Sequence, residues 1–435
     1  MDLRKFLSNH LKNAKITIMK HQKADAKKRI LIGIIIALCV GIAGMIAGFT
    51  IYRSLRGKEA VSKTENQAAR KKEKPKSGEA QKEDQPEPED PVKTRAEEIL
   101  EGMSLQEKVD QMFLITPEKL TGVSVVVQAG ESTKAALAEH PVGGLVYFSQ
   151  NLESAEQTDS MIRSVQEYSR IPLLIAVDEE GGDVARVAGS LGTTRFEPMY
   201  RYREQGGETA RQNAQTIGQD ISRFGFNTDF APVADVWSNH NNTVIGERAY
   251  SDDFAQAASL VPEAVKGFHD AGIICCLKHF PGHGDTDEDS HSQAAFTDKS
   301  LDEMTAQEWT VFKAGIDAEA DMVMVGHVTA TQIDDVPATV SYKLVTDMLR
   351  GQLGFEGVVI TDSLQMGAVT QQYNAGELAV KAVQAGVDML LEPADFEQAE
   401  QSLTEAVQSG AVSEERINAS VQRILEMKIR RGVIQ

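Results

Sequence analysis

Eight short apolar segments alternate with amphipathic segments along most of this chain, and this alternation constrains the fold more than any other feature. The apolar segments are near-continuous runs, which is typical of parallel strands that are covered on both faces. Eight strand-helix pairs in about 340 residues predict an α/β fold, a (β/α)₈ barrel of the TIM type. The predicted strands lie at 112–115, 144–148, 173–177, 228–234, 273–279, 322–327, 358–361 and 387–391.

Helices are expected between these strands because apolar residues recur there at helical spacing. They are predicted at 154–169, 208–223, 254–271, 301–318 and 375–385. The alternative architecture is an open doubly wound sheet, which more often carries a glycine-rich phosphate loop after its first strand. No such loop follows 112–115, so the sequence favours the barrel.

The first 93 residues differ from the rest of the chain in composition. Residues 30–52 carry no charge and are long enough to span a bilayer as one helix, although a cleaved signal peptide is an alternative. Residues 53–93 are rich in Lys, Glu, Gln, Pro and Ser, which predicts a disordered linker. The expected domains are a cytoplasmic basic tail at 1–29, a transmembrane helix at 30–52, the linker at 53–93 and the barrel at 94–435.

Charge is distributed unevenly along the chain. Residues 1–93 hold 20 Lys and Arg against 11 Asp and Glu, whereas residues 94–435 hold 25 against 53. So acidic a domain repels phosphate backbones, which argues against nucleic acid as a partner. Six Lys and Arg lie in the 15 residues before the apolar stretch and four in the 15 after it, which favours a cytoplasmic N-terminus. The expected location is the cell membrane, with one span and an extracellular barrel.

Polar residues follow most of the predicted strands. DEEGG at 178–182 follows the third strand, and Asp235, His279, His327 and Asp362 stand at the ends of the fourth to the seventh. The carboxyl ends of the strands meet on one face of a barrel, and that face carries the active site in barrel enzymes. We therefore expect a functional site there.

Asp362 closes the apolar strand at 358–361. A carboxylate at the mouth of such a strand is partly desolvated and costs stability unless it has a partner or a function. The functional interpretation is a nucleophile, or a stabiliser of a cationic transition state. The alternative is an N-cap for a helix that begins near 364–366.

The densest group of titratable residues is KHFPGHGDTDEDSH at 278–291. Asp289 and His291 lie two residues apart and face the same way if the loop is extended. The carboxylate could then orient the imidazole for general acid/base chemistry. The alternative is an exposed pair without a role.

A metal site is a further alternative for this stretch. Its spacing matches neither a helix-face pair nor a compact zinc finger, so we expect no metal and no other cofactor. The residues of that alternative are His279, His283, Asp285, Asp289 and His291.

Five further side chains are candidates for binding a polar ligand. Asp178 can accept hydrogen bonds from vicinal hydroxyls and Arg186 can donate to oxygens, unless the two form a surface salt bridge. Lys278 and His279 are potential donors or buried structural groups. Arg248 is another long donor after a polar loop.

Together these motifs resemble glycoside hydrolase family 3, in its β-N-acetylglucosaminidase branch. The resemblance runs from about residue 95 to 435. Several motifs in order, with compatible spacing, make it specific. It rests on DEEGGDVARV at 178–187, FNTDFAPVADV at 226–236, IGERAY at 245–250, KHFPGHGDTDEDSH at 278–291, the segment 322–328 and VVITDSLQMGA at 358–368.

The resemblance implies a retaining exo-β-N-acetylglucosaminidase that acts on peptidoglycan-derived or related glycans through a covalent glycosyl-enzyme. It implies Asp362 as nucleophile and His291 as acid/base with Asp289 as its partner. The Asp-Ser-His triplet distinguishes this branch from relatives with a Glu acid/base on a second domain, and no such domain is expected here. Sugar contacts are implied for Asp178, Arg186, Arg248, Lys278 and His279.

One departure from the family pattern is Asp183, where similar proteins often carry Arg; it puts a charge contact at the rim in doubt. Phosphorolysis stays open beside hydrolysis because a neutral imidazole does not repel an anionic acceptor as a carboxylate does. β-Glucosidase activity stays open too. Alternatives of other classes are a metal-dependent barrel hydrolase and a non-catalytic glycan-binding barrel.

Overall fold

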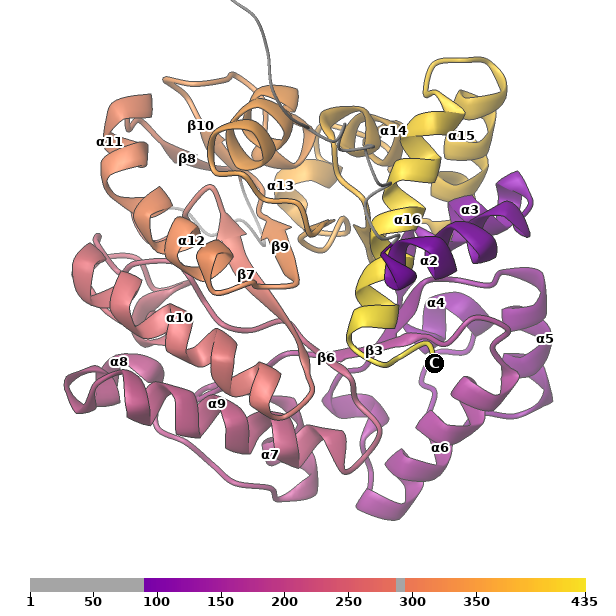
Figure 1. Ribbon diagram of the computed structural model, residues 1–435, viewed down its shortest axis with the longest axis horizontal. Helices are drawn as coiled ribbons and strands as arrows, with labels where there is room; N and C mark the ends of the chain where they lie inside the picture. Colours follow the sequence, from indigo (N-terminus) through magenta and orange to yellow (C-terminus); the bar gives the residue numbers. More distant parts are fainter. Residues whose placement is uncertain (1–89, 287–293) are drawn as a thin grey trace, which may run out of the picture. The chain divides into compact units, whose positions relative to one another are not determined.

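The computed structural model describes residues 90–286 and 294–435, which form the predicted (β/α)₈ barrel (Figure 1). Eight parallel strands follow one another in the order β11-β9-β7-β6-β3-β2-β1-β12. A parallel bridge between Ile360 and Met389 joins the two edges, so the barrel is nearly closed. The strands are β1 (Phe113–Ile115), β2 (Gly144–Val146), β3 (Leu174–Val177), β6 (Thr228–Asp229), β7 (Ile274–Phe280), β9 (Met322–Val325), β11 (Val358–Thr361) and β12 (Leu390–Leu391).

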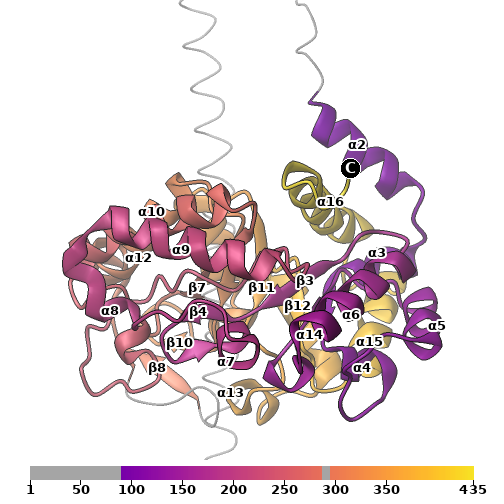
Figure 2. The same ribbon diagram turned by 90° about the horizontal axis from the view of Figure 1, so that it is seen from below.

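Helices surround these strands (Figures 1 and 2). Several begin at side-chain caps; Ser154, for example, accepts a hydrogen bond from the Gln157 N–H and starts the helix after β2. The helices are α2 (Pro91–Glu101), α3 (Leu105–Gln111), α4 (Pro117–Thr121), α5 (Glu131–Glu139), α6 (Ala155–Tyr168), α7 (Arg186–Leu191), α8 (Met199–Tyr202), α9 (Gly207–Ser222), α10 (Phe254–Asp270), α11 (Leu301–Ala306), α12 (Glu308–Asp317), the π-helical η5 (Lys343–Gln352), α13 (Gly367–Thr370), α14 (Ala375–Ala385), α15 (Phe396–Gln408) and α16 (Glu414–Arg430).

All eight predicted strands are confirmed, with differences at their ends. Every residue of β3, β7, β9 and β11 is buried, as expected for strands covered on both faces. The predicted strand at 228–234 is shorter, because Pro232 cannot donate a ladder hydrogen bond and pairing resumes only as a bridge from Val233 to Lys278. Two small strand pairs were not predicted: antiparallel β4 (Glu179–Gly181) with β5 (Val184–Ala185), and parallel β8 (Ala295–Thr297) with β10 (Val328–Ala330).

The predicted helix at 301–318 is interrupted between α11 and α12, at Gln307. Two tertiary contacts accompany the break. The buried Glu308 carboxylate pairs with Lys299, and the Trp309 indole N–H donates to the Pro281 carbonyl at 3.1 Å. Contacts with the loop after β7 thus override the local helical preference.

The boundary predicted between linker and barrel, after residue 93, lies a few residues too far along the chain. Helix α2 begins at Pro91, inside the predicted linker at 53–93, because the Asp90 side chain caps it and Pro is favourable in the first helical turn. The helix packs on α16 (Figure 2). Residues 1–89 are outside the described residues, and with them the predicted transmembrane helix at 30–52. Within 90–286 and 294–435, every helix is too short or too polar to cross a membrane.

Candidate active site

A cavity of about 520 Å³ lies at the carboxyl ends of the barrel strands. The predicted site residues that the structure describes all contribute to its wall, and these are Asp178, Arg186, Arg248, Lys278, His279 and Asp362. Apolar side chains such as Val146, Phe148 and Leu391 line the remainder. The size and the mixed lining suit a small polar ligand with one apolar face.

Four charged residues form an ion-pair network in the wall of the cavity. The Lys278 ammonium donates to a carboxylate oxygen of Asp178 at 2.7 Å and lies 2.6 Å from one of Glu180. The Arg248 guanidinium donates to both oxygens of Glu180, at 2.7 and 2.8 Å. The Glu180 side chain is 0% exposed, whereas those of Arg248 and Asp178 are 19% and 21% exposed. The buried Glu180 carboxylate therefore pairs with both cations, and Asp178 and Arg248 stay partly open to the cavity.

These ion pairs keep the network charged. Burial raises the pKa of Glu180, but the charges of Arg248 and Lys278 outweigh it and hold this pKa well below its usual range. Burial lowers the pKa of Lys278, and the carboxylates of Asp178 and Glu180 more than reverse this effect. Fixed cationic donors beside an anionic acceptor suit a ligand rich in hydroxyl groups.

His279 is oriented by a buried carboxylate. Asp235 accepts from the His279 ring Nδ1 at 2.6 Å, and from the backbone N–H groups of His279 and His283 at 3.0 and 2.7 Å. Burial raises the pKa of Asp235, but the nearby His279 outweighs it and the net shift is downward. The ionised carboxylate accepts a hydrogen bond from the Nδ1–H, so Nε2 is the ring atom left for a ligand.

Asp362 is the first residue after β11 and is half-buried in the wall of the cavity. Its N–H donates to the Val325 carbonyl of β9 at 2.9 Å, and its Oδ1 accepts from the Ser363 N–H at 2.7 Å. Burial raises the pKa of Asp362, but charge on His279 and His327 outweighs burial and lowers it. The carboxyl group therefore stays ionised, as a nucleophile must be.

The helix-cap alternative for Asp362 is wrong, because the next helix begins at Gly367 with Met366 as its cap. Ser363, the residue after Asp362, is in contact with His327. The His327 Nε2 lies 2.9 Å from the Ser363 carbonyl, and its Nδ1 lies 2.6 Å from the Thr339 hydroxyl. This strand-end histidine supports the residue after Asp362 and is not among the residues that line the cavity.

Arg186 begins α7, and the backbone there is anchored by Glu179. The Glu179 carboxylate accepts from the N–H groups of Val187 and Ala188 at 2.6 and 2.9 Å. In the described part of the chain, the Arg186 Nε atom is buried without a hydrogen-bond partner. A buried donor left unpaired is costly, so this N–H is available to a ligand oxygen. The alternative of a surface salt bridge is wrong, since Asp178 pairs with Lys278.

Two predicted catalytic residues, Asp289 and His291, lie outside the described residues, and their roles stay predictions. The described chain stops at Thr286, three residues after His283, which lines the cavity. Asp183, the departure from the family pattern, is exposed and is not among the residues that line the cavity.

Sequence reasoning missed other cavity residues. Glu180 stands inside the DEEGG motif, but its role depends on Arg248 and Lys278, which are distant in sequence. Glu392 follows β12 and is an acid at the end of an apolar run, which is the signal that singled out Asp362. It lines the cavity and accepts from the Gln365 side-chain amide at 2.9 Å.

Glu392 gives the cavity a pH-sensitive group. Burial, and next the charge of Asp178, raise its pKa from 4.5 to about 7. Between these two values the unfolded chain loses the proton while the folded chain keeps it, so the free energy of unfolding falls as pH rises through this window. The full penalty above the raised pKa is about 3 kcal/mol.

Replacing Glu392 with Gln should remove this pH-dependent penalty. Relative to the unchanged protein, the free energy of unfolding of Glu392→Gln should increase by about 3 kcal/mol between about pH 4 and pH 8. Urea unfolding at several pH values measures this difference, with the exposed Glu397→Gln as the surface-carboxyl control. A difference that does not change with pH would mean that the Glu392 proton is bound no more tightly in the folded state.

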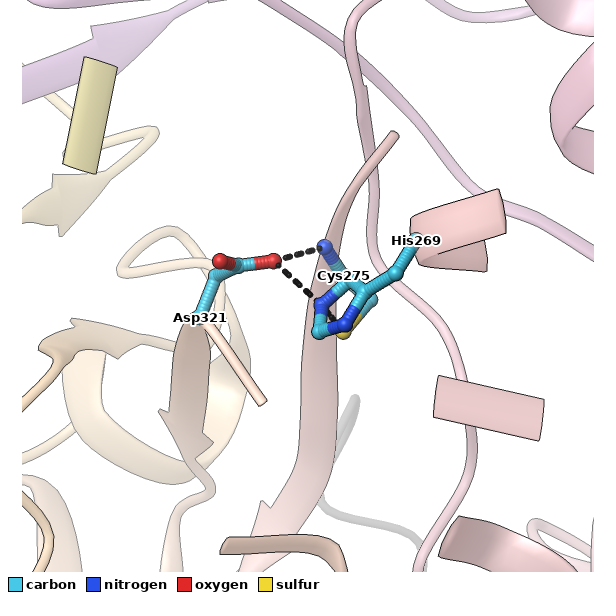
Figure 3. Close-up of side chains that lie close together, drawn as sticks. All are labelled: His269, Cys275 and Asp321. Carbon is cyan, nitrogen blue, oxygen red and sulfur yellow. Dashed lines mark hydrogen bonds and ion pairs between the residues drawn. The ribbon is translucent and has the colours of Figure 1, made fainter. Parts of the chain in front are cut away.

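Clusters of potential metal ligands lie away from the cavity. Within 90–286 and 294–435, the groups of three His, Cys, Asp or Glu side chains that lie close together are both outside it. One consists of His269, Cys275 and Asp321 (Figure 3). The metal site that the sequence left open as an alternative includes Asp289 and His291. Since both lie outside the described residues, that alternative is not tested.

The described residues of the cavity suit one kind of chemistry. An ionised carboxylate, Asp362, faces a space that is also lined by the hydroxyl-binding network and by His279. A polyol held by that network would present one ring carbon to the carboxylate. This arrangement allows nucleophilic displacement at that carbon, and an acid/base group is needed to complete the reaction.

Comparison with known proteins identifies the family. The model of the glycosyl hydrolase family 3 N-terminal domain matches residues 104–427. The beta-hexosaminidase A of Pseudoalteromonas piscicida is 33% identical over 322 residues, which are 67% of this chain and 54% of that protein. The beta-hexosaminidase of Stenotrophomonas maltophilia (strain R551-3) is 35% identical over 265 residues, which are 59% of this chain and 77% of that protein.

A solved structure is similar as well. The glycoside hydrolase family 3 beta-N-acetylglucosaminidase from Paenibacillus sp. superposes with a TM-score of 0.72 at 36% identity. The match covers 76% of this chain and 63% of the Paenibacillus protein. The chain thus spans little more than half of the Pseudoalteromonas relative and under two thirds of the Paenibacillus one.

Proposed function

The chain belongs to glycosyl hydrolase family 3, and from this premise we propose that it is a retaining exo-β-N-acetylglucosaminidase. It would remove terminal N-acetylglucosamine from peptidoglycan-derived or related glycans. The observation that carries the proposal is that Asp362 shares one cavity with the Lys278–Asp178–Glu180–Arg248 network. The names of the similar proteins support the amino-sugar substrate.

The proposed mechanism has two displacements. Asp362 attacks the anomeric carbon while His291 protonates the leaving oxygen, so that the glycosidic bond breaks as the glycosyl-enzyme ester forms. His291 then takes a proton from water, which attacks the same carbon and releases Asp362 as a carboxylate. Asp289 orients the imidazole. Asp178, Arg186, Arg248, Lys278 and His279 bind the sugar.

A panel of aryl β-glycosides, assayed with and without phosphate, tests the substrate and the acceptor together. The proposal expects turnover of the N-acetylglucosaminide above the glucoside, with free sugar as product in both buffers. A sugar phosphate as main product would make the protein a phosphorylase, and preference for the glucoside a β-glucosidase. Inactivation by a chelator would favour a metal-dependent hydrolase, and binding without turnover a glycan-binding barrel.

Replacing His291 with Ala tests the acid/base assignment. The substitution should lower kcat/KM, which reports the steps up to the glycosyl-enzyme, about a hundredfold or more for an aglycone that leaves poorly, because only such an aglycone needs protonation. It should change the glycosylation step little for an activated nitrophenyl aglycone. The exposed His240 is outside the cavity lining, and His240→Ala is the matched control. Equal losses on both kinds of substrate would reject the acid role.

We further propose that residues 30–52 anchor the protein in the cell membrane and that the barrel is extracellular. The uncharged length of this stretch and the basic residues before it support the proposal. Protease treatment of intact cells tests it. The barrel should be cleaved from its anchor, whereas protection of the barrel would place it in the cytoplasm.

A further inference from the structure

A second group of potential ligands lies outside the cavity. Asp110 comes from α3, His140 directly follows α5 and Glu400 comes from α15. One ligand atom of each lies within 4.8 Å of the others. The His140 Nδ1 is 2.8 Å from a carboxylate oxygen of Glu400. Three segments that are far apart in the sequence thus bring two carboxyl groups and an imidazole to one point.

The cluster lacks a compensating cationic side chain. In the described residues, neither Asp110 nor Glu400 forms an ion pair with Lys or Arg. Asp110 is 0% exposed, and its Oδ2 has no hydrogen-bond partner there. Two buried carboxyl groups in contact need a proton or a cation between them.

The cluster of His269, Cys275 and Asp321 shows the contrast (Figure 3). There the Arg431 guanidinium donates to Asp321 at 2.5 Å and lies 2.8 Å from the His269 Nε2. Asp321 also accepts from the Cys275 N–H at 3.0 Å. The charge of Arg431 already balances the Asp321 carboxylate. This cluster therefore links the end of α16 to the barrel and needs no further cation. At Asp110 the balancing cation is what is missing.

We propose that Asp110, His140 and Glu400 bind a divalent transition-metal ion. One imidazole and two carboxylates are a ligand set that zinc accepts. The amide of Gln106 now donates to Asp110 at 3.2 Å and to Glu400 at 2.7 Å, and rotating it about its last bond would offer its oxygen as a fourth ligand. The site is independent of the proposed activity.

Access and position fit such an ion. A surface pocket of about 490 Å³ is lined by His140 and Glu400, and also by the acidic Glu139 and Glu405. A cation can therefore enter from solvent through a mouth of favourable charge. Along the chain, Glu400 is 260 residues from His140 and 294 residues from Gln106. A metal here would fasten the first helices of the barrel to α15, near the closure between β1 and β12.

Zinc binding to the full chain tests the proposal. After removal of metal with a chelator and dialysis against zinc, elemental analysis should find one zinc per chain. The melting midpoint should rise by about 4 °C at a hundredfold excess of zinc over Kd. Asp110→Asn keeps the shape of the side chain and should lose both the zinc and the shift. Glu400→Gln is the second variant, should Asp110→Asn fail to fold.

Matched controls separate this site from others. Glu405→Gln changes the mouth of the same pocket without removing a ligand, and it should keep the zinc. His291→Ala should also keep it, which separates the cluster from the predicted acid/base pair. The proposal fails if the unchanged protein binds no zinc, which would leave a shared proton between the carboxyl groups. It also fails if Asp110→Asn and Glu400→Gln retain the metal, or if His291→Ala loses it.

Discussion

Replacing Asp362 with Ala should lower kcat/KM for an aryl β-N-acetylglucosaminide by about 10⁴-fold or more. Two other carboxylates of the cavity, Glu180 and Asp178, cannot take over its role. Glu180 is held by Arg248 and Lys278, and Asp178 is held by Lys278. Neither could attack the ring carbon without breaking the ion pairs that position the sugar. The alanine variant should therefore bind substrate but fail to form the glycosyl-enzyme.

Small anions provide a sharper readout than loss of activity alone. Alanine leaves a space beside the anomeric carbon, and azide in that space should attack the carbon while the aryl oxide leaves. The product of Asp362→Ala with azide should be the α-glycosyl azide, because a single displacement inverts the configuration. Asp183→Ala, at an exposed position outside the cavity lining, should keep full activity. Activity of Asp362→Ala close to that of the unchanged protein would contradict the nucleophile assignment.

The barrel was predictable because its strands are apolar on both faces and eight such runs leave few architectures. What the sequence could not place were features set by contacts between distant segments. The helix at 301–318 breaks because Trp309 reaches Pro281, and the short pairing of β8 with β10 joins loops that no local pattern connects. Helix α2 packs on α16, at the other end of the chain, and no local pattern indicates this contact.

The site was predictable where a residue type at a strand end carries its own signal. Asp362 and His279 interrupt apolar runs, and both line the cavity. Roles that depend on a partner distant in the sequence could not be predicted. His327 looked like a site residue because it ends a strand, yet it holds the Ser363 carbonyl. Glu180 looked like one acid among several, because nothing local indicates that Lys278 of β7 and Arg248 of the segment after β6 converge on it.

Glu180→Gln should destabilise the folded protein by about 3–5 kcal/mol, which makes it the second large effect expected. Glutamine keeps the volume of the side chain but removes the negative charge that Arg248 and Lys278 share. Lys278 retains the Asp178 carboxylate, while in the described part of the chain Arg248 keeps no anionic hydrogen-bond partner beside the Val244 carbonyl, at 2.9 Å. A buried guanidinium without its counter-ion is costly. Sugar binding should weaken as well, because both donors lose the group that orients them.

A surface ion pair of the same length isolates the effect of burial. Arg201 and Glu247 also approach to 2.7 Å, but their side chains are 55% and 35% exposed. Solvent screens that pair, so Glu247→Gln should leave urea unfolding almost unchanged. Combining Glu180→Gln with Arg248→Met removes both charges and should be less destabilising than the sum of the single changes. Additive effects, or equal stability of Glu180→Gln and Glu247→Gln, would mean that Glu180 does not hold the network together. The sugar-binding donors would then owe their positions to packing alone.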